Sequence, residues 1–165
     1  MNHILAAKIQ AMAQADQAMR NNAINNDAPW DSSLDKLHTK RLKKIIERYG
    51  WPSFSLVGPQ VSNDAWLLVQ HADHDAAFQE ECLRLMKALP AGEVRLANIA
   101  YLEDRILVGR GKLQLYGTQF MGVGKDLAPQ PIKDETHLDE RREAMKLGPF
   151  ADYKKLMFKE YGDKG

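Results

Sequence analysis

The sequence has one cysteine, no long apolar run and almost no net charge, and each shortage excludes a class of protein. Cys82 is alone, so the chain cannot form an internal disulfide or a cysteine-based zinc site. No stretch has the apolar length of a membrane-spanning helix, and polar residues interrupt Met1–Arg20 too often for a signal peptide. The 23 basic and 22 acidic residues leave a formal charge of +1, which gives no general attraction to nucleic acid or to membranes. We therefore expect a cytoplasmic protein with neither as a partner.

What the chain does contain is an ordinary globular composition. Its 165 residues are 44% hydrophobic and 27% charged, enough apolar material for a hydrophobic core of normal size. The sequence shows no internal repeat and no linker-like tract. We expect a single globular domain over residues 1–165, with frayed ends at 1–3 and 162–165.

Apolar residues recur at helical spacing over most of the chain. The pattern predicts helices over residues 5–23, from a cap at Ser33 or Asp35 to Tyr49, from Ser62 or Asn63 to about 72, from a cap at Asp75 to before Pro90, and over 93–108, 136–146 and 150–161. Asp16 and Arg20, four residues apart, are expected on the surface of the first helix. Trp30 in the following loop is expected to fill part of the core.

The periodicity changes after Gly109-Arg110-Gly111. Leu113, Leu115 and Gly117 alternate with polar neighbours, which predicts a hairpin that pairs residues 113–121 with 127–132. The expected fold class is mainly α (α+β), a helical domain of about six to seven helices with one short β-hairpin near residues 113–132.

The densest group of titratable and polar side chains follows the apolar stretch Trp66–Val69. It consists of Gln70, His71, Asp73, His74 and Asp75. A histidine can move a proton near neutral pH, and a neighbouring carboxylate can fix its tautomer. His71 and Asp73 are therefore candidate catalytic residues, and Gln70 is a candidate hydrogen-bonding group. The alternative is that His71 binds a loop while the two aspartates cap helices.

Two further polar groups interrupt apolar segments. Asp104 and Arg105 lie between Leu102 and Ile106 in a predicted helix, where an unsatisfied charge is costly. They form either a substrate clamp, with Asp104 as a third catalytic candidate and Arg105 as an anion ligand, or an internal salt bridge. Tyr116, Thr118 and Gln119 place hydroxyl and amide groups beside Gly117, as the wall of a ligand site or as a bulge in the hairpin.

Several of these motifs resemble a bacterial family of small proteins known as a domain of unknown function. The resemblance rests on Trp66–Asp73 (WLLVQHAD), Tyr101–Arg105 (YLEDR) and Tyr116–Gln119 (YGTQ), with further matches at Asp16-Gln17, Arg20 and Arg141-Arg142. It covers most of the chain. It implies no particular reaction. The family motif His-Ala-Asp-x-Asp matches His71, Asp73 and Asp75.

Three hypotheses about function follow. The first is a small acid–base enzyme, a hydrolase or lyase, that acts on a small polar or peptidic substrate and needs no cofactor. The second is a non-catalytic module that binds a protein, peptide or small molecule, in which the same residues form a structural polar network. The third is a metal-dependent phosphohydrolase. It requires one continuous helix, on which His71, His74 and Asp75 would share a face.

Overall fold

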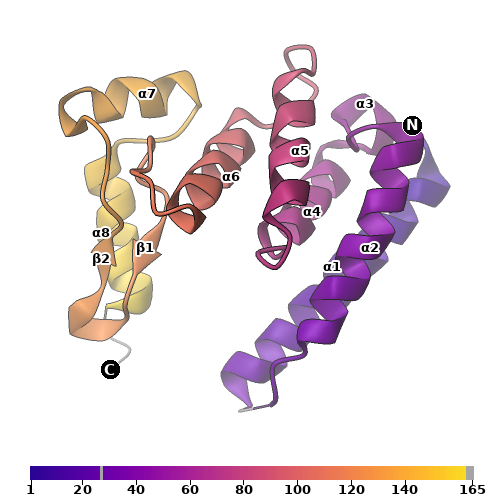
Figure 1. Cartoon of the computed structure of the whole chain (residues 1–165), viewed down its shortest axis with the longest axis horizontal. Coiled ribbons are helices and arrows are strands. Elements are labelled where there is room, and N and C mark those ends of the chain that lie inside the picture. Colours follow the sequence, from indigo (N-terminus) through magenta and orange to yellow (C-terminus); the bar gives the residue numbers. More distant parts are fainter. Residues whose placement is uncertain (27, 163–165) are drawn as a thin grey trace. The chain divides into compact units, whose positions relative to one another are not determined.

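The computed structural model describes residues 1–26 and 28–162. This part of the chain is mainly helical and has one short two-stranded antiparallel sheet, which confirms the predicted fold class (Figure 1). The chain divides into two compact units, Met1–Arg95 and Leu96–Gly165, and each is described by itself. The single domain stays a prediction. Residues 163–165 of the C-terminus that was expected to fray lie outside the described residues.

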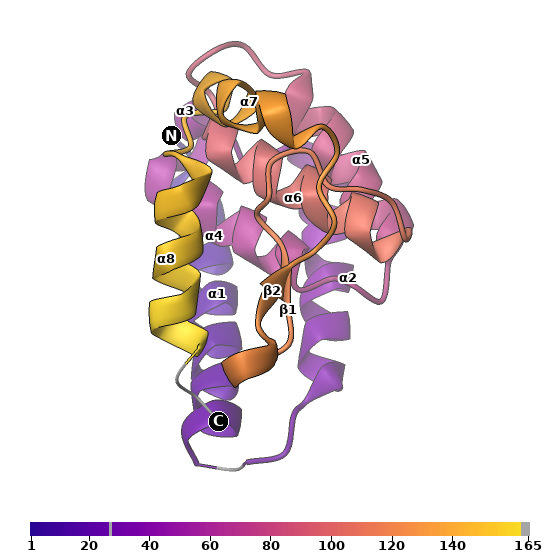
Figure 2. The same cartoon turned by 90° about the vertical axis from the view of Figure 1, so that its left-hand side faces the viewer.

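The first unit is built on two long helices. Helices α1 (His3–Asn25) and α2 (Ser32–Tyr49) run antiparallel, side by side, in both views (Figures 1 and 2). Helices α3 (Phe54–Val57), α4 (Pro59–Gln70) and α5 (Ala76–Lys87) follow. Its core is formed by apolar side chains from these helices, including Leu5, Ile9, Met12, Leu42, Leu68, Val69, Phe78, Cys82 and Met86. Among the described residues no helix combines the length and apolar character needed to cross a membrane.

The start of α1 and the loop after the helix need separate comment. The Asn2 side chain accepts a hydrogen bond from the Leu5 backbone, and the Asn2 backbone N–H donates to the Leu56 carbonyl at 2.7 Å. These two hydrogen bonds connect residue 2 to the helix and to α3, and fraying of residues 1–3 stays a prediction. Trp30 is not in the core; its side chain is 52% exposed and lies against the Arg20 guanidinium, 4.6 Å from the ring centre.

Helix starts follow the capping residues. Asp75 caps α5 through its hydrogen bond from the Phe78 backbone, as predicted. Asp31, not Ser33 or Asp35, caps α2, because its carboxylate accepts both the backbone N–H and the hydroxyl of Ser33. Helix α4 begins at Pro59, before the predicted start, since proline suits the first helical turn. The short α3 occupies a segment for which the sequence predicted no helix.

The second unit combines three helices with the small sheet. Helix α6 (Leu96–Gly109) leads into strands β1 (Phe120–Met121) and β2 (Ala128–Pro129), which are joined through a 3-10 turn at Gly124–Asp126. A second 3-10 turn (Glu135–His137) precedes α7 (Leu138–Ala144), and α8 (Phe150–Tyr161) closes the unit. Figure 1 shows α8 beside the two strands. The Tyr153 ring packs edge-on to Phe120 across this contact, with their centres 5.8 Å apart.

The hairpin is shorter than predicted. Only Phe120–Met121 and Ala128–Pro129 form a ladder, with one isolated bridge between Gln114 and Ile132. The backbone N–H groups of residues 115, 116 and 118 donate hydrogen bonds to the Asp104 carboxylate and not to a neighbouring strand. Those donors are not available to a partner strand, so the segment from 114 to 119 is a loop.

Gly117 makes the closest approach in this loop. Its φ is +66°, and a Cβ atom there would lie 2.7 Å from Cε2 of Phe150. We expect Gly117→Ala to lower the free energy of unfolding by about 2–3 kcal/mol, because it adds left-handed strain and a ring clash. Urea denaturation measures it. Gly109→Ala, where a Cβ meets nothing within 4 Å, is the control; equal effects of the two substitutions would contradict the steric argument.

Candidate functional site

His71 lies where α4 ends. Its backbone N–H donates to the Leu67 carbonyl as the C-cap of the helix, and a turn then leads to α5 at Ala76. The single continuous helix that the metal alternative requires is therefore not formed, and His71, His74 and Asp75 do not share one helical face. Asp75 caps α5 and pairs with Lys43, at 2.5 Å between Nζ and Oδ2. In the described parts of the chain, no group of three or more potential ligands could hold a metal ion.

The carboxylate beside the His71 ring comes from α1. The His71 Nδ1 atom is 2.9 Å from Oδ2 and 3.1 Å from Oδ1 of Asp16. Asp16 has no solvent exposure, whereas the His71 side chain is 19% exposed. No described residue forms a hydrogen bond with the second ring nitrogen, Nε2. The pair thus has the form of a histidine–aspartate dyad with one ring nitrogen available.

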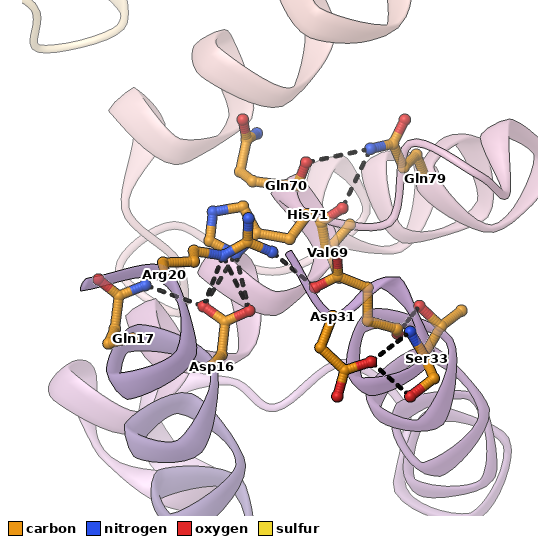
Figure 3. A network of polar contacts seen from close by, with 11 residues as sticks. Asp16, Gln17, Arg20, Asp31, Ser33, Val69, Gln70, His71 and Gln79 are labelled. Atoms are coloured by element: carbon orange, nitrogen blue, oxygen red, sulfur yellow. Dashed lines mark hydrogen bonds and ion pairs between the residues drawn. The ribbon is translucent and has the colours of Figure 1, made fainter. Parts of the chain in front are cut away.

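Three more side chains complete what we call the Asp16 cluster: Asp16, Gln17, Arg20, Asp35 and His71. Figure 3 shows Gln17, Arg20 and His71 converging on Asp16. The Arg20 Nε atom lies 3.1 Å from both Asp16 oxygens, and its Nη2 atom donates to Asp35 at 2.6 Å. The cluster links α1, α2 and the end of α4.

The surroundings of Asp16 favour its ionised form. Burial acts to raise its pKa, but the hydrogen bonds from His71 and Arg20 outweigh it and lower the pKa to about 2. Asp16 is therefore a buried anion at neutral pH. Such an anion holds an imidazole in one tautomer, with the proton on Nδ1, and stabilises the imidazolium.

Gln70 and Asp73 lie in the same unit as His71. The Gln79 side chain from α5 donates to the carbonyls of Val69 and Gln70, and to Asp73 Oδ1 at 3.2 Å. Gln70 is buried, whereas Asp73 is exposed. Asp73 was expected to orient His71, but the carboxylate that contacts Nδ1 of His71 is that of Asp16.

The remaining predicted residues lie in the second unit, around Asp104. This carboxylate is fully buried and accepts hydrogen bonds from the backbone of Leu115, Tyr116 and Thr118 and from the Thr118 hydroxyl, at 2.7–3.2 Å. Burial raises its pKa, against the lowering effect of these donors. Both oxygens are engaged within the fold, so Asp104 shapes the 114–119 loop.

The other candidates of this unit surround that loop. Gln119 donates to the Thr118 hydroxyl, and its Oε1 atom is 3.5 Å from the Arg105 guanidinium. The Tyr116 hydroxyl donates to Glu103, and burial together with this acidic neighbour raises the pKa of Tyr116 to about 12. Thr118 is buried, whereas Gln119 and Arg105 are partly exposed.

The sequence interpretation missed several buried polar side chains. Asp16 was placed on a surface, yet it continues the spacing Leu5, Ile9, Met12, and that periodicity could have shown that it faces the core. Gln114 hydrogen-bonds the backbone of Gln119 and Gln130, and Arg142 donates to the carbonyls of Tyr116 and Gly148. Neither carries a local sequence signal.

The comparisons with known proteins agree with the resemblance seen in the sequence. The model of a family of unknown function, DUF6624, matches residues 4–165, and the chain belongs to this family. No curated protein and no solved structure matches it. The family assigns no reaction, so function has to be argued from the geometry of the chain itself.

The lowered pKa of Asp16 predicts a pH-dependent stability. Its folded pKa of about 2 lies below the ordinary value of 3.8, so the ionised carboxylate contributes about 2 kcal/mol at neutral pH, and this is lost as the pH falls from about 4 towards 2. Asp16→Asn should be less stable than the wild type at pH 7, by a difference that shrinks at pH 3. Urea denaturation at both pH values measures this; an equal difference would contradict the assignment.

A second substitution tests the role of Asp104. Asp104→Asn replaces one acceptor oxygen with an amide that faces backbone N–H groups, and we expect a loss of about 3 kcal/mol in the free energy of unfolding. Glu103→Gln on the same helix, which keeps an acceptor for the Tyr116 hydroxyl, is the control. A wild-type melting temperature for Asp104→Asn would show that the loop does not depend on this carboxylate.

Proposed function

We propose that this protein is a small acid–base enzyme, a hydrolase or lyase acting on a small polar or peptidic substrate, with His71 as its catalytic residue. One observation carries the proposal. The His71 ring has Nδ1 at 2.9 Å from a fully buried carboxylate, and its Nε2 atom has no partner among the described residues. A structural histidine in a closed polar network would use both nitrogens.

The chemistry follows from this arrangement. In hydrolysis, Nε2 of neutral His71 takes a proton from the attacking water, and the imidazolium then gives that proton to the leaving group. In an elimination, the same atom takes the proton from the carbon next to the one that bears the leaving group. The C–H electron pair then forms the C=C bond as the leaving group departs, and the imidazolium gives its proton to that group. Asp16 stays ionised, accepts a hydrogen bond from the Nδ1–H group throughout and lowers the cost of the positive ring, so it is a positioning residue.

Arg20 is the group best placed to hold an anionic substrate next to His71. Its Nε and Nη2 atoms bind Asp16 and Asp35, and its guanidinium lies over Trp30. The Nη1 atom forms no hydrogen bond with a described residue. It could bind a substrate carboxylate. Within the first unit, Gln70 and Asp73 stay candidates for further contacts.

The second unit has a supporting role in this proposal. Asp104, Tyr116 and Thr118 shape the 114–119 loop, and we no longer assign Asp104 a catalytic role. Arg105 and Gln119 stay candidates for contacts with a ligand of the second unit alone. The cytoplasmic location, inferred from the composition and from the lack of a signal-peptide pattern, also stays a prediction.

A non-catalytic binding module is the second candidate. The observation that favours it is the position of the Asp16 cluster, which links three helices. Its central carboxylate, that of Asp16, is buried and receives three side-chain donors. Here His71 would stabilise the packing of α4 against α1, and binding would occur on another surface.

Replacing His71 separates the two candidates. His71→Gln keeps an amide donor for Asp16 but cannot take up a proton. We expect it to lower turnover at least 100-fold on a panel of p-nitrophenyl esters, aminoacyl p-nitroanilides and β-elimination substrates, with little change in melting temperature. His74→Gln, an exposed histidine of the same turn, is the control and should be silent in both measurements.

The opposite pattern supports the binding module. In this pattern the wild type converts none of the substrates faster than His71→Gln does, and His71→Gln melts several degrees lower than the wild type. These two results together would contradict the catalytic proposal.

A further inference from the structure

A hollow surface runs along α1 and α2 on the first unit. Between the helices lies a groove of about 500 Å³, with Met12, Leu34 and Ile45 among its apolar lining residues. A second hollow of about 330 Å³ shares Lys8, Lys44 and Ile45 with it. Together they form what we call the α1/α2 groove. Its volume lies in the range of small-molecule sites.

The charge along the α1/α2 groove has one sign. Lys8, Arg41 and Lys44 line the larger hollow, and Arg48 lines the smaller one. No aspartate or glutamate is among the described residues that line either hollow, and within the described chain none of these four cations forms an ion pair. An apolar floor with a cationic rim suits a ligand that has an apolar body and an anionic head.

A buried histidine marks one place in the groove. His38 is among the residues that line the larger hollow and is only 3% exposed, yet its Nδ1 atom is buried and has no hydrogen-bond partner among the described residues. A buried polar atom without a partner is costly. If the ring turns towards the groove when a ligand binds, the head group would supply the missing hydrogen bond.

We infer that the α1/α2 groove binds a free aliphatic anion of the fatty-acid type, with its chain along Met12 and Ile45 and its head group between His38 and the cations Arg41 and Lys44. The groove is concave, which favours a single free molecule over a membrane surface. This site is separate from the proposed reaction of His71, and neither residue of the dyad lines it.

Calorimetric titration of the full chain with decanoate, below its critical micelle concentration, tests the site. We expect saturable binding of one decanoate per chain, weakened by added salt because the rim charges are screened. Decanol lacks the charge and acetate lacks the chain, and each should bind at least tenfold more weakly. Equal affinity for all three would overturn the inference.

Two pairs of variants locate the binding. Ala15→Phe fills the groove from an exposed position and should weaken decanoate binding at least tenfold; Ala18→Phe, exposed on the same helix but outside the lining, should not change it. Lys44→Gln should weaken binding severalfold, whereas Lys40→Gln, an exposed lysine that does not line the groove, should leave it unchanged. Circular dichroism confirms that each variant is folded.

The His38 contact has its own readout. In ¹⁵N NMR spectra of the imidazole, the Nδ1 resonance of His38 should shift on addition of decanoate. Decanoate binding that Ala15→Phe leaves intact, or binding to anionic phospholipid vesicles without binding of monomeric decanoate, would show that the groove is not this site. So would a chain that self-associates through this face, detected by light scattering, and binds no decanoate.

Discussion

The buried charge of Asp16 sets the arrangement of the first unit. A carboxylate without solvent contact is costly unless hydrogen-bond donors surround it, and here those donors come from two places. Arg20 lies one turn further along α1, and His71 lies at the end of α4. Because Arg20 also binds Asp35 on α2, satisfying this one charge specifies how three helices meet.

The second unit satisfies its own buried carboxylate by different means. Asp104 uses the backbone of a loop and one hydroxyl instead of cationic side chains. Arg141 and Arg142 bind carbonyl groups of the same loop from the outside, those of Leu115 and Tyr116. The Asp16 carboxylate thus has beside it the His71 imidazole, which can transfer a proton, whereas backbone groups enclose the Asp104 carboxylate. This contrast is why we place the chemistry at His71.

Local sequence signals predicted the helices and the cap at Asp75, because apolar spacing and capping depend on neighbouring residues. They also singled out His71, since a histidine after a strongly apolar stretch is conspicuous. Local signals did not predict the place where a side chain accepts the backbone hydrogen bonds that a strand would have used. The predicted strand over 113–121 was cut short by Asp104, which lies 11 residues before Leu115, the first backbone donor that it binds. Asp16 has a local signal only for Arg20, four residues further along the helix. Its contact with His71 and the contacts of Asp104 depend on the tertiary fold.

The two buried carboxylates, Asp16 and Asp104, differ in how many residues separate each from its distant hydrogen-bond partners. The partners of Asp104 lie 11 to 14 residues away, whereas His71 is 55 residues from Asp16. Closing the longer loop costs about 1 kcal/mol more in chain entropy. Local pairings of this kind form sooner than distant ones. The loop around Asp104 can therefore assemble early in folding, while the histidine–aspartate dyad forms only once α4 has docked on α1.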